Sequence, residues 1–354
     1  MSKKKNYQFS YLKSGVNVKL GNDLVKEIKP FSKKTLNNRV IGGIGGFGAV
    51  YNLDVNKYKK PYLVSATDGV GTKILIAREL KNYKTIGIDL VAMSVNDIIV
   101  QGAKPLFFLD YIAVEKIKKN QILDIIKGIS KGCIESDCSL VGGETAELPG
   151  LYNDSKFDLA GFCVGIVEKK NLLPKKGVKP GNLLLGLPSN GIHSNGYSLI
   201  RNIFLKKQIS YNKKFYNNKS YGDVLLKPTK IYVKPILKIL DHVNVNALCH
   251  ITGWGISENL KRVIPKKLGA SIKLSKLDFN NKRSIFYWLG NNCNLSIKEM
   301  LSTFNCGIGM IIIIRQKDLD KTLGLCKEIH QPVKLLGKII DNEKFIFNWS
   351  VLVE

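Results

Sequence analysis

The sequence lacks the long apolar runs that mark membrane-spanning and exported proteins. Its longest aliphatic run, Met310 to Ile314, is far shorter than the ~20 apolar residues that a transmembrane helix needs. The first six residues, MSKKKN, contain no apolar core of a signal peptide. We therefore expect a chain that does not cross a membrane and that stays in the cytoplasm.

Cysteine is also scarce, and its spacing excludes two kinds of site. The chain has seven cysteines, an odd number, and no C-x-x-C pair. This pattern argues against a disulfide framework and against a zinc site, and it fits a reducing cytoplasm. We expect the cysteines, Cys133 and Cys138 among them, to serve in packing.

Acidic residues are outnumbered, since 28 Asp and Glu against 55 Lys and Arg give a net charge of +27. A charge of this size ordinarily indicates a nucleic-acid or membrane-surface partner. The lysines are scattered along the chain, however, and no Arg-rich stripe with interleaved aromatic residues is present. We expect a solvated basic surface that attracts anionic substrates and no specific nucleic-acid partner. A basic nucleic-acid-binding protein is the alternative.

The chain does contain enough apolar residues for two domains, with 44% hydrophobic residues in a length of 354. Segment 169–181, rich in Lys, Pro and Gly, is the best candidate boundary. Strand-like and helix-like segments alternate on both sides of it. The sequence therefore predicts an α+β fold with an N-terminal domain over 1–172 and a C-terminal domain over 173–354.

The predicted elements follow from apolar periodicity and from Gly and Pro at their ends. Predicted helices cover 22–29, 74–80, 86–101, 121–136, 198–206, 229–241, 256–264 and 318–329. Predicted strands cover 49–55, 62–67, 105–114, 159–168, 182–187, 247–251 and 309–315. The strands of the first half are too apolar to leave one sheet face and one edge in water, which predicts a homodimer.

The stretch from Ser65 to Pro105 carries the strongest functional signal. Asp68 lies at the tip of the strand over 62–67, and strand tips often carry functional residues. The loop after it supplies backbone freedom, a hydroxyl and a cation from Gly69, Gly71, Thr72 and Lys73. This order, followed by a helix, is typical of an anion bound near a helix start.

The predicted helix over 86–101 has an oxygen-rich face. Asp89 and Asn96 are seven residues apart, about two turns, and Asp97 lies beside Asn96. A straight helix would separate Asp89 from Asp97 by roughly 12 Å, too far for both to ligate one ion. Either carboxylate could instead share an ion with Asp68 and with phosphate oxygens. The alternative is that they are surface or capping carboxylates.

Glycine-rich segments supply further candidates in the first half. Gly42 to Gly48 contains the G-x-G-x-x-G spacing of dinucleotide-binding loops, but without the strand and helix that such a loop requires. We interpret it as a glycine flap over an anion, or as an ordinary flexible loop. Lys29, at the end of a predicted helix, could reach a phosphate, although most exposed lysines reach only water. A second strand tip, 139–141, runs into Gly142-Gly143-Glu144-Thr145.

A polar loop over 188–197 precedes a helix in the second half. Such a loop can hold phosphate or sugar hydroxyls. It contains His193, one of only four histidines. A lone histidine is more often structural than catalytic, but its place between a strand and a helix favours a function.

Several motifs occur in a fixed order along nearly the whole chain. They are GGIGGFGA, ATDGVGTK, IGIDLVAMSVNDIIVQGAKPLFFLDY, LVGGETAELPG, DLAGFCVGIVE, HSNGYSLIR, KPTKIYVK and STFNCGIGMII. Together they resemble the phosphoribosylformylglycinamidine cyclo-ligase family, also called aminoimidazole ribonucleotide synthetases. The resemblance implies an N-terminal mixed sheet with helices that forms a dimer core, and a C-terminal α+β domain that closes the active-site cleft. It implies Mg²⁺ and ATP, and closure of formylglycinamidine ribonucleotide to aminoimidazole ribonucleotide in de novo purine synthesis.

The matching motifs also imply roles for individual residues. Catalytic roles are implied for Asp68, Asp97 and His193, with His193 as a proton donor or acceptor. Magnesium ligands are implied at Asp68, Asp89, Asp97 and Glu144. ATP contacts are implied for Lys29, Gly43, Gly45, Gly46, Gly48, Gly69, Gly71, Thr72, Lys73, Asn96, Gly142, Gly143 and Thr145. Substrate contacts are implied for Ser194, Asn195 and Thr252.

One turn departs from the family pattern. Where the family usually has Thr-Gly-Gly-Gly, this chain has Thr252-Gly253-Trp254-Gly255. An indole side chain cannot adopt every backbone conformation that is open to glycine. The resemblance therefore does not fix the geometry of this turn.

Overall fold

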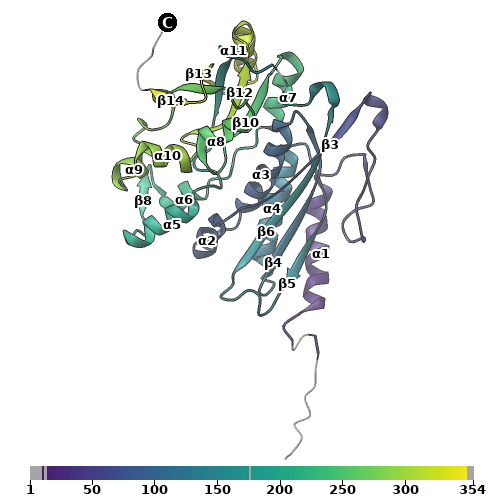
Figure 1. Cartoon of the computed structure of the whole chain (residues 1–354). Helices are drawn as coiled ribbons and strands as arrows, with labels where there is room; N and C mark the ends of the chain where they lie inside the picture. The colour runs from purple at the N-terminus through teal and green to yellow at the C-terminus, as the bar shows by residue number, and fades with distance from the viewer. Residues whose placement is uncertain (1–9, 12–13, 175–176, 349–354) are drawn as a thin grey trace, which may run out of the picture.

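The computed structural model describes residues 10–11, 14–174 and 177–348. The MSKKKN segment, which carried the expectation about a signal peptide, lies outside these residues. The described residues form a four-stranded and a six-stranded sheet, each with its own helices, and two small two-stranded sheets (Figure 1), so the predicted α+β class is confirmed. Among the described residues, no helix is long and apolar enough to cross a membrane.

The first half forms a four-stranded sheet. Its elements are α1 (Val18–Lys33), β1 (Val40–Ile41), β2 (Val50–Tyr51), β3 (Pro61–Gly69), α2 (Lys73–Glu79), α3 (Ile86–Val100), β4 (Lys104–Val114), α4 (Lys119–Glu135), β5 (Ser139–Glu147) and β6 (Phe157–Glu168). The strand order is β3-β6-β4-β5, with β4 and β5 parallel and the other pairs antiparallel. α3 packs on β3, β6 and β4, while α4 and α1 pack on β5.

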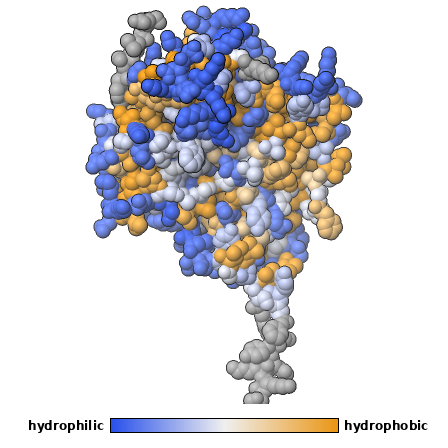
Figure 2. Space-filling view, in the orientation of Figure 1, coloured by the Kyte–Doolittle hydropathy of each residue, from blue (hydrophilic) through white to orange (hydrophobic). Residues whose placement is uncertain are grey.

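The opposite face of this sheet is apolar and exposed. Leu63, Tyr111 and Phe162 are between 41% and 60% exposed, although each belongs to a strand of the sheet. In β6, Phe162 lies between the buried Gly161 and Cys163, as the two-residue repeat of a strand with one covered face requires. Figure 2 shows hydrophobic residues gathered on the right-hand side, the side on which Figure 1 draws this sheet and the segment before it.

α3 is the central helix of the molecule. Of its residues, only Asp97 and Val100 are not buried. A helix that is apolar on all sides belongs in a core. The sheet covers one side, α4 covers another, and β10 and α7 of the second half cover a third. The contact with α4 is so close that a Cβ on Gly87 would lie 2.1 Å from the carbonyl oxygen of Ile125.

The second half forms a six-stranded sheet. Its elements are β7 (Leu183–Pro188), α5 (Tyr197–Lys206), β8 (Lys214–Tyr216), β9 (Lys219–Ser220), α6 (Tyr221–Leu225), α7 (Val233–His242), β10 (Ala247–His250), α8 (Gly255–Lys261), β11 (Gly269–Lys273), α9 (Ile285–Asn292), α10 (Ile297–Thr303), β12 (Ile308–Ile314), α11 (Leu319–Glu328), β13 (Lys334–Ile340) and β14 (Phe345–Asn348). The order is β10-β12-β7-β13-β11-β14. β12 is fully buried between β10 and β7, which leaves β10 as the edge strand beside α3.

Most predicted elements are confirmed, but α1 is longer than predicted. It runs through Pro30, where the prediction ended it. Its buried residues Leu24, Ile28 and Ser32 follow a four-residue spacing that continues past the proline. Lys26 and Pro30 are both exposed, so water can satisfy the carbonyl group that loses its helical partner. Packing of this apolar stripe outweighs the lost hydrogen bond.

The predicted strand over 49–55 is wrong in length. Only β2 is extended there, in a short hairpin with β1. Asp54 has a φ of +45° and begins a turn over Val55–Lys57, which ends the strand. The first sheet ends at Glu168 and the second begins at Leu183, and the predicted domain boundary at 172/173 lies between them.

Candidate active site

The glycine flap, α1 and the end of β5 surround a small cavity of about 220 Å³. Its apolar wall is formed by α1 together with Ile44 of the flap and Ile117 and Ile126. Its polar wall contains Gly142, Gly143, Glu144 and Thr145. A Cβ on Gly45 would lie 3.7 Å from the ammonium nitrogen of Lys29. The structure thus brings the predicted ATP-binding residues of β5, the flap and α1 together, and we call this cavity the α1 slot.

Asp110 also lines the α1 slot, and the sequence reasoning missed it. Its side chain is only 8% exposed. Burial, with a smaller contribution from the nearby Glu144, raises the pKa of this carboxyl to about 7, while its own backbone N–H opposes the change. A sequence signal existed, because Asp110 is two residues from the apolar Phe108 and two from the apolar Ile112. Both of these neighbours are fully buried in the structure. The two-residue repeat of a strand places all three on the same face.

Asp89 lies inside the molecule and not on an open acidic face. Its carboxylate is fully buried and forms an ion pair with the equally buried Lys73 at 2.8 Å. It also accepts hydrogen bonds from the backbone N–H of Thr229 at 2.7 Å and from the Ser194 hydroxyl at 3.2 Å. This corrects the expectation that Asp89 is free to ligate an ion, because its charge is already neutralised.

Lys73 likewise has no donor left for a phosphate in this structure. Its ammonium group donates to Asp89, to the carbonyl oxygen of His193 at 3.0 Å and to that of Lys227 at 2.6 Å. Burial lowers its pKa, and the Asp89 charge opposes that shift. The predicted anion-binding cation therefore acts as an internal cation that joins the two halves of the chain.

Asn96 also binds the second half of the chain. It is fully buried, donates to the carbonyl oxygen of Lys230 at 2.9 Å, and accepts from the backbone N–H of Tyr232 at 3.0 Å. Asn96 and Asp89, which the sequence placed on one helix face, together hold the segment from Thr229 to Tyr232. We call this buried set, with Lys73 and Ser194, the interdomain clamp.

Asp97 points into a cleft of about 480 Å³ between β3 and β10. Its side chain is 43% exposed and lies 2.9 Å from the Nδ1 atom of His250, at the end of β10. The Nε2 atom of His250 is buried and has no partner among the described residues. Arg262 and Asn259 line the same cleft. Sequence reasoning did not select His250, although it is one of the four histidines and directly precedes a glycine turn.

Asp68, at the end of β3, lies close enough to Asp97 for their charges to interact. Burial raises the pKa of Asp68, the Gly69 N–H opposes the shift, Asp97 adds to it, and His250 counters it. Two neighbouring carboxylates form a donor set of the kind that Mg²⁺ binds. Over residues 10–11, 14–174 and 177–348, however, no group of three or more His, Cys, Asp or Glu side chains is placed to hold one ion.

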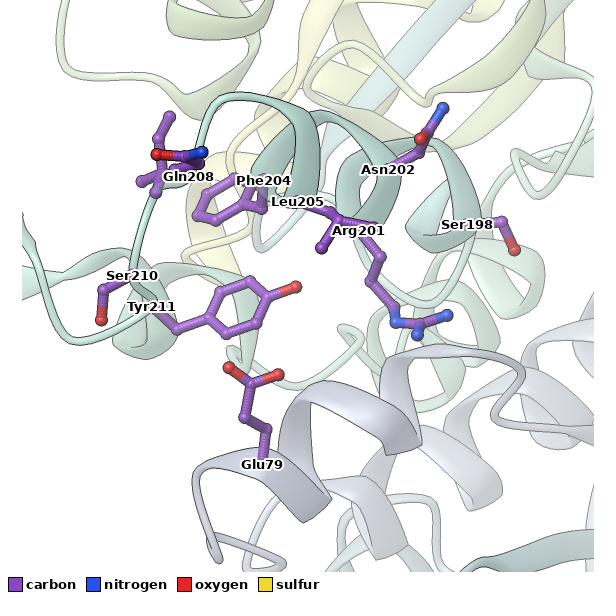
Figure 3. A pocket seen from close by; sticks show the side chains of 10 residues that line it. Glu79, Ser198, Arg201, Asn202, Phe204, Leu205, Gln208, Ser210 and Tyr211 are labelled. Carbon is purple, nitrogen blue, oxygen red and sulfur yellow. The ribbon is translucent and has the colours of Figure 1, made fainter.

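A larger cavity, of about 630 Å³, lies elsewhere among the described residues, between α2 and α5. Figure 3 shows Glu79 directed from α2 toward Tyr211, and Arg201 extending from α5 toward α2. None of the residues predicted for the site lines it. We therefore locate the candidate site by its convergent polar groups and not by cavity size.

Comparisons with known proteins show the family to which this chain belongs. Family models described as "AIR synthase related protein", N-terminal and C-terminal domains, match residues 48–167 and 179–350. A phosphoribosylformylglycinamidine cyclo-ligase of Chromobacterium violaceum is 46% identical over 334 residues, which cover 94% of this chain and 96% of the relative. The enzyme of the same name from Nitrosococcus oceani is 45% identical over 357 residues, covering 98% and 99%. The chain belongs to the phosphoribosylformylglycinamidine cyclo-ligase family.

Solved structures with low sequence identity share the fold of this cyclo-ligase family member. Thiamine-monophosphate kinase from Stenotrophomonas maltophilia is 16% identical, with a TM-score of 0.67 over 90% of this chain and 94% of the kinase. A hydrogenase maturation protein, HypE, solved in complex with ATP, is 14% identical, with a TM-score of 0.63 over 93% and 88%. These similarities show the fold alone.

The loop that matches the cyclo-ligase substrate motif is tightly held. His193 is 1% exposed, and its Nε2 atom accepts hydrogen bonds from the backbone N–H groups of Asn190 at 3.0 Å and Lys230 at 3.4 Å. Its Nδ1 atom therefore carries the proton of the neutral ring, and this atom has no partner among the described residues. Burial lowers the pKa of His193 well below its ordinary value, and the charges of His250, Lys73 and Lys230 add to the effect.

This loop also contacts the loop after Asp68. A Cβ on Gly71 would lie 3.8 Å from the carbonyl oxygen of Ser194, and the Thr72 hydroxyl lies 3.0 Å from that of Ser198. The predicted residues Gly69, Gly71 and Thr72 thus lie at the junction of the two halves, apart from the α1 slot.

The turn Thr252-Gly253-Trp254-Gly255, which departs from the cyclo-ligase pattern at Trp254, still packs closely against neighbouring side chains. Trp254 has a φ of +75°, a conformation that favours glycine, and its indole is 78% exposed. Thr252 is held by the side chain of Asn259, at 3.2 Å. The preceding Gly253 approaches the carboxamide of Asn195, since a Cβ there would lie 3.2 Å from its oxygen. The predicted substrate contacts Asn195 and Thr252 therefore remain neighbours.

Proposed function

We propose that this chain catalyses the ATP-dependent closure of formylglycinamidine ribonucleotide to aminoimidazole ribonucleotide, ADP and phosphate, a step of de novo purine biosynthesis. The observation that carries the proposal is the 45–47% identity to proteins named phosphoribosylformylglycinamidine cyclo-ligase over 94–98% of this chain. Similarity over this length includes both domains and the interdomain cleft.

The chemistry requires removal of a formamide oxygen, which is a poor leaving group. Transfer of the γ-phosphoryl group of ATP to this oxygen forms an imidate-type phosphate and ADP. The ribose-bearing amidine nitrogen then attacks the same carbon, and inorganic phosphate leaves as the ring closes. The protein has to hold the two reactants in line and to exclude water from the phosphorylated intermediate.

Asp68 and Asp97 are the residues that we propose for holding Mg²⁺, and Glu144 is a third oxygen donor beside the α1 slot. Their fit rests on the interaction between the Asp68 and Asp97 charges and on the partial exposure of Asp97. When bound, Mg²⁺ neutralises the charge that moves during phosphoryl transfer. Asp89 is left out of this set because Lys73 already neutralises it.

The remaining predicted contacts divide between the two reactants. Lys29, the flap glycines, Gly142, Gly143 and Thr145 are proposed for ATP, because they surround or adjoin the α1 slot. Ser194, Asn195 and Thr252 are proposed for the ribonucleotide. His193 is proposed to act on protons only after a movement that exposes its ring, since the ring is buried here.

We further propose a homodimer in which the exposed face of the first sheet is covered by a second copy. Support comes from Leu63, Tyr111 and Phe162, large apolar side chains that one sheet face leaves in water. Sedimentation at micromolar concentration is expected to show a dimer. A folded, active monomer would refute this part of the proposal.

The function is tested by incubating purified protein with ATP, Mg²⁺ and formylglycinamidine ribonucleotide. Appearance of a diazotisable aminoimidazole, in step with ADP, is the expected result. Absence of this product while the protein is folded would overturn the proposed function.

In the cell we propose a cytoplasmic enzyme without a specific nucleic-acid partner, so duplex DNA should bind only weakly and in a salt-sensitive manner.

A further inference from the structure

The cleft into which Asp97 points, which we call the β3–β10 cleft, is large enough to enclose a substrate. Its volume of about 480 Å³ lies within the ~300–1,000 Å³ of pockets that bind small ligands. β3 and α3 of the first half and β10 and α8 of the second half contribute to its walls. Among the described residues that line it, Arg262 is the only lysine or arginine and Asp97 is the only carboxylate. The cleft thus contains a candidate anion-binding side chain beside a candidate metal ligand.

The guanidinium group of Arg262 has most of its hydrogen-bonding capacity unused. Among the described residues its one side-chain hydrogen bond is to the side-chain oxygen of Asn259, and at 3.4 Å this bond is long. Arg315, by contrast, pairs with the carboxylate of Asp318 at 2.8 Å. A guanidinium group has five N–H donors in a planar fork that matches the oxygens of a phosphate. Arg262 is therefore suited to bind an anionic ligand in the cleft.

Asn259 connects Arg262 with the turn that contains a proposed substrate contact. Asn259 is 3% exposed, and its amide nitrogen donates to the carbonyl oxygens of Gly253 at 2.9 Å and Gly255 at 2.7 Å. Its side-chain oxygen accepts from the Thr252 hydroxyl at 3.2 Å and from the guanidinium group of Arg262. Thr252 and Arg262 share this acceptor, so the arginine lies beside a residue proposed for the ribonucleotide.

A second polar group of the β3–β10 cleft also lacks a partner. The ring of His250 lines the cleft and is 3% exposed, and its Nε2 atom is buried without a hydrogen-bond partner among the described residues. Because the Asp97 carboxylate accepts from Nδ1, Nε2 is the acceptor of the neutral ring. A buried acceptor without a donor is costly, which indicates that a ligand completes this wall. A sugar hydroxyl supplies the donor that Nε2 needs.

The sheet order separates Arg262 from the residues proposed for ATP. β3, which lines the cleft, is one edge of the order β3-β6-β4-β5, and β5, whose Gly142, Gly143 and Thr145 line the α1 slot, is the other edge. Three strand spacings of about 4.8 Å place these edges roughly 14 Å apart. The 5′-phosphate is the only anionic group of the ribonucleotide. It is therefore a better match for Arg262 than the phosphates of ATP.

We propose that Arg262 binds the 5′-phosphate of the ribonucleotide in the β3–β10 cleft, with the ribose between Arg262 and His250. This inference rests on the proposed function for the identity of the ribonucleotide, and it adds the residue that holds the phosphate end of that substrate. The role of Arg262 is thus separate from that of the carboxylates Asp68 and Asp97, which are proposed to act where the phosphoryl group is transferred.

The test compares formylglycinamidine ribonucleotide with the riboside, which lacks the 5′-phosphate. The full-length protein, saturated with Mg²⁺ and a non-hydrolysable ATP analogue, is titrated calorimetrically with each compound. The wild-type protein is expected to bind the ribonucleotide about 10- to 100-fold more tightly, the size of a charge-assisted hydrogen bond. In Arg262→Met the ribonucleotide should weaken by the same factor, the riboside should be unchanged, and the two should bind within about threefold of each other.

Two further variants separate phosphate binding from folding and from net charge. Arg262→Lys keeps the charge but not the planar fork, so it should bind the ribonucleotide more tightly than Arg262→Met and less tightly than the wild-type protein. Lys261→Met removes the adjacent exposed cation, whose partner is Glu258, and should leave both affinities unchanged. Thermal unfolding of each variant checks that it is folded. Affinity for the ATP analogue is expected to stay the same in all of them.

The outcomes distinguish this inference from the proposed function. If the wild-type protein makes the aminoimidazole product and Arg262→Met keeps full affinity for the ribonucleotide, only the inference is overturned. Weaker binding of the ATP analogue alone would assign Arg262 to the phosphates of ATP, and equal weakening of ribonucleotide and riboside would assign it to the shape of the cleft. Either result also overturns the inference.

A wild-type protein that forms no product would overturn the proposed function, and titration with ribose 5-phosphate then tests the β3–β10 cleft by itself. Binding by the wild-type protein that is lost in Arg262→Met would support a phosphate site at Arg262. Equal binding by both proteins, or no binding by the wild-type protein, would overturn it.

Discussion

The α1 slot and the interdomain clamp both contain buried charged groups, but they differ in what surrounds those groups. In the clamp, Lys73 and Asp89 bind each other and groups of the second half. In the slot, Asp110 lines a cavity of about 220 Å³ and interacts with the charge of Glu144. A buried ion pair that also binds the second half joins the two halves of the chain, whereas a buried carboxyl in the wall of a cavity has no oppositely charged neighbour of this kind. We therefore expect the clamp to contribute to stability and the slot to respond to pH.

Removing the cation of the clamp should produce the largest effect on stability. Lys73→Met leaves Asp89 as an uncompensated buried charge, which typically costs about 3–5 kcal/mol in free energy of unfolding. Urea unfolding followed by circular dichroism measures this loss. The matched control is Lys26→Met, which removes an exposed ion pair with Asp23 and should cost less than about 1 kcal/mol. Equal losses in the two variants would show that the clamp is not a stabilising unit.

The buried carboxyl of Asp110 in the α1 slot should make the free energy of unfolding depend on pH. The pKa of Asp110 in the folded protein, about 7, lies above the ordinary value of 3.8. Between these values the folded state binds the proton and the unfolded state does not, so stability falls as pH rises from about 4 to about 7. The full loss corresponds to about 4 kcal/mol, at about 1.4 kcal/mol for each pH unit.

Asp110→Asn removes this titration. Its melting temperature should resemble that of the wild-type protein near pH 4 and exceed it near pH 8, where the wild-type carboxyl is buried as a charge. Parallel melting curves for the two proteins across this range would show that Asp110 ionises as an exposed acid does.

Asp97 differs both from Asp89 in the clamp and from Asp110 in the slot, because its side chain is nearly half exposed and its partner is His250. Asp97→Asn keeps the size of the side chain and removes the charge that would help to hold Mg²⁺. Turnover should fall by about 100-fold, or roughly 3 kcal/mol of barrier, with little change in stability. Asp137→Asn, an exposed acid paired with Lys104, is the control and should be active. Near-normal ring closure by the Asp97 variant would leave Asp68 and Glu144 as the proposed metal ligands.

The sequence predicted the order of helices and strands well, because apolar periodicity is a local property. It also selected Asp68 and Asp97, which the structure places close enough for their charges to interact. It could not predict that Asp89 and Asn96 would bind the second half, because the spacing along a helix specifies a face and not what packs against that face. Asp110 was missed although the sequence does carry a signal for it. An acid inside an apolar strand conflicts with the local pattern, and such conflicts often mark functional positions.

The turn at Trp254 should give the smallest effect, and it tests whether an exposed position in the second half is under strain. A non-glycine residue with a φ of +75° costs on the order of 1 kcal/mol, and glycine would relieve this cost while adding about 0.5–1 kcal/mol of backbone entropy. Trp254→Gly should therefore change the free energy of unfolding by less than about 1 kcal/mol. Trp254→Ala keeps the backbone strain and removes the indole, which is mostly in water. If glycine stabilises and alanine does not, the strain is real and the indole contributes little to folding. If both variants lose more than about 1 kcal/mol, the indole contributes to folding in solution, although it is 78% exposed in this structure.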